Sequence, residues 1–177
     1  LQLPMDMQVG FINKLDVNTF RTKLTEAETS LHHHTPLLLF DNHDRPRIDA
    51  RYGDGVHDED IQRVLSTILF ASRGTALFYY GDEIGMKTTP PRHKEDVKDP
   101  IGITGWPKEK GRDGERTPMQ WDAGKNSGFS VAASTWLPVA PDYITTNVIS
   151  QEADPDSLLD WHKKLIAMRK TDPTLRD

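Results

Sequence analysis

The chain has 177 residues, of which 36% are hydrophobic and 28% are charged, so it can bury one core of ordinary size. Its net charge of −5 argues against the class of proteins that hold nucleic-acid phosphates with clustered Lys and Arg. It has no cysteine, which excludes disulfide and thiolate–metal frameworks. No apolar run reaches the roughly 20 residues of a membrane span, so neither a nucleic acid nor a membrane is expected as a partner.

The N-terminus does not identify the compartment. The chain begins with Leu1-Gln2-Leu3-Pro4 rather than Met, so we expect that it starts inside a longer coding sequence. Any targeting segment would then be missing. Localisation in the cytoplasm and secretion both stay open.

The first 40 residues predict a strand, a helix and a second strand. Residues 5–11 (MDMQVGF) favour a short strand, and residues 16–31 a helix. The helix prediction rests on apolar residues spaced by four, three and four positions, namely Phe20, Leu24, Ala27 and Leu31. Residues 36–40 (PLLLF) are a dense apolar run, which is typical of a buried parallel strand.

The next helix and strand repeat this order. Asp58 is a fair N-cap for a helix whose apolar stripe comprises Ile61, Val64, Leu65, Ile68 and Leu69. Residues 75–80 (TALFYY) predict a third strand. Successive strands are separated by roughly 35 residues, which is the length of a βαβ unit.

Residues 86–153 differ from what precedes them, because they show little periodicity and hold more than half of the prolines. A structured segment of this length is unusual unless it is functional or belongs to a larger assembly. A last helix is predicted to begin at Asp154-Pro155, an N-cap followed by Pro at the first helical position. Its apolar stripe comprises Leu158, Trp161, Leu165 and Met168.

These elements predict an α/β fold with three strands and three or four helices in βα order. Three parallel strands alone would leave both edges of the sheet open. The pattern therefore fits a portion of a larger α/β protein better than a finished domain.

Two polar clusters follow predicted strands, at residues 41–47 (DNHDRPR) and 81–83 (GDE). Loops at the carboxyl ends of parallel strands are where α/β folds place their chemistry. In the first cluster, the imidazole of His43, the carboxylate of Asp44 and the guanidinium of Arg47 suit a polyhydroxylated substrate. A carboxylate accepts two hydroxyls and favours positive charge that develops nearby. A strand-end turn in which Asp and Asn cap backbone groups is the alternative, and the residues alone leave both open.

Three motifs resemble one known family. Residues 39–47 (LFDNHDRPR) resemble the strand-7 signature of glycoside hydrolase family 13, the α-amylase family, and the Pro-Arg ending is similar to its α-glucosidase and oligo-1,6-glucosidase branch. Residues 74–86 (GTALFYYGDEIGM) resemble strand 8 of that branch, and residues 112–122 (RDGERTPMQWD) the loop after it. The resemblance covers most of residues 36–175, with its motifs in the family's order.

The resemblance implies a fold, which is a partial (β/α)8 TIM barrel comprising about strands 6 to 8 with their helices. Residues 1–35 would form the strand-6 unit, residues 36–73 the strand-7 unit, and residues 74–177 strand 8, a long loop and the closing helix. Strands 1 to 5 would lie outside this chain. The remainder of the same barrel is therefore an expected partner.

The resemblance also implies retaining hydrolysis of α-linked gluco-oligosaccharides, in which a carboxylate nucleophile and a carboxylic acid act about 5 Å apart. It makes Asp44 the catalytic residue that stabilises the transition state, and His43 and Arg47 substrate-binding residues. The family's nucleophile and acid/base follow strands 4 and 5, so this chain alone is expected to be inactive. No cofactor and no metal ion are expected.

Two alternatives stay open. A trehalose-forming isomerase or a glucosyl transferase shares the same motifs, so hydrolysis and transfer are not distinguished. A non-catalytic homologue would be a binding or interaction protein, but a purely structural barrel has no need for His43 beside Asp44. The Asn-His-Asp sequence also occurs in metal-dependent phosphoesterases, whose upstream Asp-x-His and Gly-Asp motifs residues 1–40 lack.

Structural roles are expected for several other polar or aromatic residues. The run His32-His33-His34 fits a helix-to-strand turn better than a metal site, and residues 108–112 (KEKGR) fit a solvated loop. Asp82 and Glu83 favour a structural role at the top of their strand. One of four aromatic residues is expected to stack on a sugar ring, the others to pack: Tyr52, Trp106, Trp121 and Phe129.

Overall fold

The computed structural model describes residues 5–30 and 34–176. Its three strands are parallel and neighbour one another in chain order: β1 (Met5–Asp6), β2 (Leu37–Leu38) and β3 (Thr75–Ala76). Met5 is paired with Leu37, and Leu37 with Thr75. The prediction of successive parallel strands in βα order is confirmed.

The paired strands are shorter than the sequence predicted. The strand predicted over residues 5–11 was wrong beyond Asp6, because the next residues form the helical turn α1 (Met7–Gly10). Since β1 turns away there, the three-stranded ladder ends at its partner Leu38. Two further backbone hydrogen bonds extend the pairing of β2 and β3: the Thr75 N–H donates to the Pro36 carbonyl at 2.8 Å, and the Leu77 N–H to the Leu38 carbonyl at 2.9 Å.

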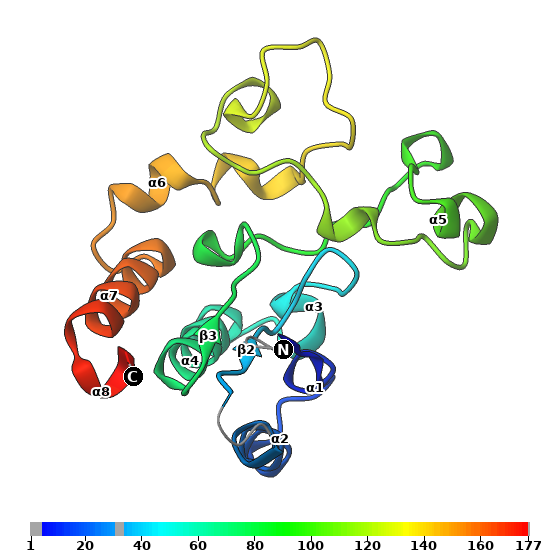
Figure 1. Ribbon diagram of the computed structural model, residues 1–177. Helices are drawn as coiled ribbons and strands as arrows, with labels where there is room; N and C mark the ends of the chain where they lie inside the picture. The colour runs from blue at the N-terminus through cyan, green and yellow to red at the C-terminus, as the bar shows by residue number, and fades with distance from the viewer. Residues whose placement is uncertain (1–4, 31–33, 177) are drawn as a thin grey trace.

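Three long helices and several short ones connect and follow the strands. The long helices are α2 (Val17–Ser30), α4 (Asp58–Ala71) and α7 (Leu158–Thr171). The other α-helices are α3 (Ile48–Tyr52), α5 (Pro100–Gly105), α6 (Val148–Glu152) and α8 (Pro173–Arg176). Short 3-10 helices are η1 (Asp82–Ile84), η2 (Lys94–Asp96), η3 (Asp113–Glu115), η4 (Lys125–Gly128) and η5 (Pro141–Ile144). Figure 1 shows α7 packed beside α4.

The predicted helix caps need correction. α4 begins at Asp58, so the N-cap predicted at Asp58 was wrong by one residue; the cap is His57, and the Asp58 carboxylate accepts the Gly55 N–H at 2.8 Å. α7 is capped by Ser157, so the cap predicted at Asp154 was wrong. The Asp154 carboxylate accepts the Asp156 N–H at 2.9 Å and so stabilises a turn ahead of the helix.

The main core lies between the strands and the helices α2, α3 and α4. It contains Val9, Ile12, Phe20, Ala27, Leu38, Phe40, Ile48, Tyr52, Leu65 and Leu69. The Phe20 ring lies 5.8 Å from that of Phe40 and 6.0 Å from that of Tyr52. Each such buried large apolar side chain contributes about 1.5–3 kcal/mol. Tyr52 packs, as expected for most of the aromatic residues, and its hydroxyl donates to the Ile12 carbonyl at 2.6 Å.

The last long helix is fastened to the start of the third strand by one arginine. The Arg169 guanidinium donates to the carbonyls of Phe70, Ser72 and Gly74. These carbonyls lie at the end of α4 and in the turn before β3. The C-terminal helix therefore holds the connection through which the chain enters β3.

Residues 86–153 lie above the sheet in Figure 1 and contain α5, α6 and four of the short 3-10 helices. A second apolar cluster holds this segment to the rest of the chain and comprises Ile84, Met86, Met119 and Leu159. None of the helices in residues 5–30 and 34–176 has the length and apolar character needed to cross a membrane.

Candidate functional site

The turn after β2 presents two of the predicted site residues. The Arg45 N–H donates to the Asn42 carbonyl at 3.2 Å, and the Asn42 side-chain oxygen accepts the Asp44 N–H at 2.8 Å. The capping role considered for this segment therefore applies to Asn42. The side chains of His43 and Asp44 stay accessible, with 65% and 48% of their surface exposed.

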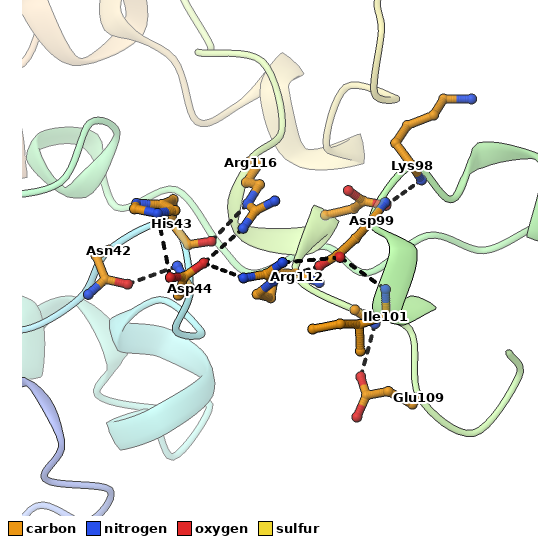
Figure 2. A network of polar contacts seen from close by, with 11 residues as sticks. Asn42, His43, Asp44, Lys98, Asp99, Ile101, Glu109, Arg112 and Arg116 are labelled. Carbon is orange, nitrogen blue, oxygen red and sulfur yellow. Dashed lines mark hydrogen bonds and ion pairs between the residues drawn. The ribbon is translucent and has the colours of Figure 1, made fainter. Parts of the chain in front are cut away.

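Two arginines from the distant loop bind the Asp44 carboxylate (Figure 2). Arg112 Nη1 lies 2.7 Å and Arg116 Nη2 2.9 Å from the same oxygen, Asp44 Oδ1. The other oxygen, Oδ2, lies 3.5 Å from His43 Nε2. Arg116 also donates from Nε to the His43 carbonyl at 2.8 Å. The arrangement holds Oδ1 from two sides and leaves Oδ2 facing His43.

A buried carboxylate orients Arg112 in turn. Asp99 is 2% exposed, and its Oδ2 accepts the Arg112 Nε–H at 2.7 Å and the Arg112 backbone N–H at 2.8 Å. Its Oδ1 accepts the Ile101 N–H, which caps α5. The bonds from Arg112 hold the pKa of Asp99 well below its usual range, and Asp99 raises the pKa of Arg112. Asp99 is therefore ionised and holds Arg112 in place for Asp44.

The loop around Asp99 is close-packed at Gly111. Gly111 has a φ of +70°, in the left-handed region that favours glycine. A Cβ there would lie 2.8 Å from the Gly102 nitrogen and 2.9 Å from the Asp99 Cβ. The close approach of these segments, and with it the position of Arg112, depends on the missing side chain.

Arg47 lies in the interior and not at the exposed tip of the turn. It has no exposed surface, and its guanidinium donates to the carbonyls of Tyr80 (2.7 Å) and Glu115 (3.0 Å). It also lies 4.9 Å from the ring centres of Tyr79 and Tyr80. These contacts tie the turn to the segment after β3 and to the loop that carries Arg116. Substrate binding by Arg47 stays a prediction, and the observed contacts are all internal.

An apolar pocket of about 410 Å³ adjoins Arg116. Its lining includes Tyr80, Met119, Leu137 and the exposed rings of Phe129 and Trp136. Flat apolar faces of this kind suit the rings of sugars. Phe129 is the member of the four aromatic residues considered from the sequence that lines this pocket.

The sequence identified the turn but not the side chains that hold it. Arg112 was placed in a solvated stretch, and this was wrong, because Arg112 binds the buried Asp99. Both arginines belong to the motif at residues 112–122, but that motif does not show which carboxylate they bind. For the histidine run, His32 and His33 lie outside the described residues. Among the residues described, no group of three or more His, Asp or Glu side chains could hold a metal ion.

Comparison with known proteins gives consistent matches along the chain. The family model for the α-amylase catalytic domain matches residues 4–177. The chain is 37% identical to a probable oligo-1,6-glucosidase 2 of Bacillus subtilis (strain 168), with 95% of this chain and 34% of the relative covered. It is 42% identical to a probable α-glucosidase of Rhizobium meliloti (strain 1021), with 77% of this chain and 24% of the relative covered. The chain thus spans about a third or less of the length of these relatives.

Solved structures match the fold over nearly the whole chain. The trehalulose synthase of Pseudomonas mesoacidophila MX-45 superposes with a TM-score of 0.86 at 25% identity, covering 99% of this chain and 36% of that one. A mutant isomaltulose synthase of Erwinia rhapontici NX5, in complex with its natural substrate sucrose, gives 0.84 at 26% identity, covering 99% and 36%.

Proposed function

The chain belongs to the α-amylase family of catalytic domains, and from this premise we propose that it forms strands 6 to 8 of a retaining α-glucosidase-type barrel. Residues 1–35, 36–73 and 74–177 are the three successive units of this proposal. The parallel order of β1, β2 and β3 supports it, as does the coverage of about a third of the relatives. The remainder of the parent protein supplies strands 1 to 5 and covers the open edges of the sheet.

The proposed reaction is hydrolysis of α-linked glucose from short oligosaccharides. In retaining glycosidases, a carboxylate attacks the anomeric carbon while a carboxylic acid protonates the leaving oxygen, and the transition state resembles an oxocarbenium ion. Asp44 stabilises that transition state and accepts hydroxyls of the sugar. His43 lies beside Asp44 Oδ2 and binds the same ring. The pocket next to Arg116 receives the next ring of the substrate.

One observation carries this assignment, namely the exposed Asp44 carboxylate with one oxygen held by two arginines. A polar group fixed before the substrate arrives costs no reorganisation in the transition state. Arg47 contributes from the interior, because it holds the loop that positions Arg116. Its effect on the sugar is then indirect.

The proposal is tested in the full-length parent by Asp44→Asn. The rate constant kcat should fall roughly 10²- to 10³-fold, the usual effect of losing one such electrostatic contact. The matched control is Asp54→Asn, because Asp54 is an exposed aspartate that also pairs with a histidine, His57, at 2.8 Å. The control should keep the parent's kcat. An unchanged kcat with a raised KM in Asp44→Asn would show that Asp44 only binds substrate.

The 177-residue chain alone is proposed to be inactive, because the family's nucleophile and acid/base lie in the absent strands. Losing the nucleophile removes the step that divides the barrier in two. Purified chain incubated with an aryl α-glucoside should release no aglycone above the buffer rate. Measurable turnover would contradict the proposal that the catalytic carboxylates lie outside these residues.

Transfer is the second candidate function, and the similarity to trehalulose and isomaltulose synthases favours it. Product analysis of the parent with sucrose distinguishes the two, since an isomerase returns an isomeric disaccharide and a hydrolase returns two monosaccharides. A non-catalytic homologue would lack the Asp after strand 4 and the Glu after strand 5. The upstream sequence of the parent therefore separates enzyme from binding protein.

A further inference from the structure

We propose that Asp41 and Asp82 share one proton and act as a single buried acid, which positions the Asp44 turn against the segment after β3. Neither residue reaches the exposed carboxylate of Asp44, so both are positioning residues. The shared proton itself does not depend on the proposed function. Only its consequence for catalysis does.

The two carboxyl groups meet in the interior, where strands β2 and β3 give way to their loops. Asp41 is 3% and Asp82 9% exposed. Asp82 Oδ2 accepts the Tyr79 N–H at 3.0 Å, and its Oδ1 lies 3.5 Å from Arg47 Nη1. Among the described residues, no N–H or hydroxyl bonds either oxygen of Asp41 in good geometry, although the Ile48 N–H faces the carboxylate. The Asp82 carboxyl also lies within hydrogen-bonding reach of Asp41, and that bond requires a proton on one of the two.

The surrounding charges favour one proton for the pair. Two adjacent buried carboxylates cannot both ionise without a large penalty. Burial raises the pKa of both groups, and the neighbouring Asp41 raises that of Asp82 further. The groups that face the pair are Arg47, the α3 residues Arg51 and Tyr52, and the backbone N–H groups of Ile48 and Tyr79. Arg47 and Arg51 both lower the pKa of Asp41, but burial is the larger effect. Arg47 also faces the carboxyl groups of Asp49, Glu83 and Glu115, so its charge is not reserved for the pair.

The pair is connected to both segments that meet at Asp44, namely the turn that carries Asp44 and the loop that carries Arg116. On one side Asp41 directly precedes Asn42, whose side chain caps the Asp44 N–H. On the other side Arg47 connects Asp82 with the Glu115 carbonyl, one residue before Arg116. A second ionisation would place two negative charges where the two segments join. Their repulsion would push apart the segments that carry Asp44 and Arg116 and so weaken the contact between these two side chains.

The first experiment detects the proton in the unmodified chain. The side-chain carboxyl groups of ¹³C-labelled aspartate are followed by NMR from pH 4 to pH 9, and infrared spectra are recorded for the carbonyl stretch of a protonated carboxyl. One protonated aspartate should persist at pH 7, and its signal should be absent from both D41N and D82N. Full ionisation of every aspartate at pH 7, or a signal that survives both substitutions, would overturn the proposal.

The second experiment uses the pH dependence of thermal unfolding. The folded chain holds a proton above the ordinary aspartate pKa of about 3.9, so stability should fall as pH rises from that value through the raised pKa of the pair. In Asp82→Asn the amide donates permanently to Asp41, and this fall should disappear, whereas Asp82→Ala should melt lower at all pH values. A parallel pH profile in the chain and in Asp82→Asn would contradict the shared proton. Neither experiment measures turnover, so the proposed function can stand or fall separately.

Discussion

At the scale of single residues, the candidate site is a chain of alternating charges from the interior to the surface. Asp99 is buried and ionised, Arg112 is about one-third exposed, and Asp44 is about half exposed. Each group fixes the next through hydrogen bonds of 2.7 Å. The orientation of the exposed carboxylate therefore depends on a residue that no substrate can reach.

The first prediction concerns Asp99→Asn. The neutral side chain keeps its shape but loses the charge that holds Arg112, so the free energy of unfolding at pH 7 should fall by about 1–3 kcal/mol. The pKa of Asp99 in the folded chain is depressed, so its contribution is present above about pH 3.9 and is lost as pH falls through the folded-state value. Denaturation followed by circular dichroism should therefore show a flatter acid limb in the variant. Glu152→Gln, which breaks an exposed pair with Lys163, should change stability by less than about 1 kcal/mol.

At the scale of elements, hydrophobic periodicity predicted the helices, whose positions depend on packing against the core. It did not predict the helix caps, which depend on single hydrogen bonds. The helix over residues 16–31 was predicted because its apolar stripe faces the core, and α2 is found there. The cap at Ser157 was missed, because Asp154 is an equally good acceptor and only its neighbours in space show that it serves a turn.

The strand lengths and the arginines of the site could not be predicted for one reason, because both depend on contacts between segments far apart in sequence. Strand lengths could not be predicted, since pairing ends where a neighbouring strand turns away, and that depends on two segments far apart in sequence. Asp44 and His43 were found because a motif places them after an apolar run. Arg112 acts from 68 residues away. No local pattern connects it with Asp44, and its charge alone is typical of a solvated loop.

The second prediction concerns the loop and uses two glycines with a positive φ. Gly111→Ala should destabilise the chain by more than the roughly 1–3 kcal/mol of backbone strain, because the new Cβ also meets the Gly102 nitrogen and the Asp99 Cβ. Gly55 also has a positive φ, of +77°, but no atom lies within 4 Å of the Cβ that Gly55→Ala would add. That substitution should therefore cost the backbone strain alone. Thermal unfolding of the two variants measures the difference. Equal losses would mean that the loop is not close-packed at Gly111.

At the scale of the whole molecule, the sheet ends on both sides with apolar residues at the surface. Met5 on β1 is 55% exposed, and Leu77, which follows β3, is 42% exposed. Open edges and exposed apolar side chains are sites for association. In the proposed parent barrel, the neighbouring strands would cover them.

The third prediction is that the isolated chain self-associates through these edges. Leu77→Ser should lower the fraction of associated material in sedimentation velocity, because it removes apolar surface beside β3. Val131→Ser is the control, since Val131 is fully exposed in the long loop, away from the sheet. If the two substitutions act alike, association does not involve the sheet edge.

The hydrogen bonds from Arg169 to the residues before β3 also have a consequence during synthesis of the chain. The Phe70 carbonyl that it binds lies 99 residues earlier in the sequence. At a synthesis rate of about 5–20 residues per second, the ribosome releases the acceptors roughly 5–20 seconds before the donor. During that interval the turn before β3 lacks the hydrogen bonds from Arg169. A message truncated shortly before the codon for Arg169 should therefore yield a product that cellular proteases remove much faster than one truncated just after α7.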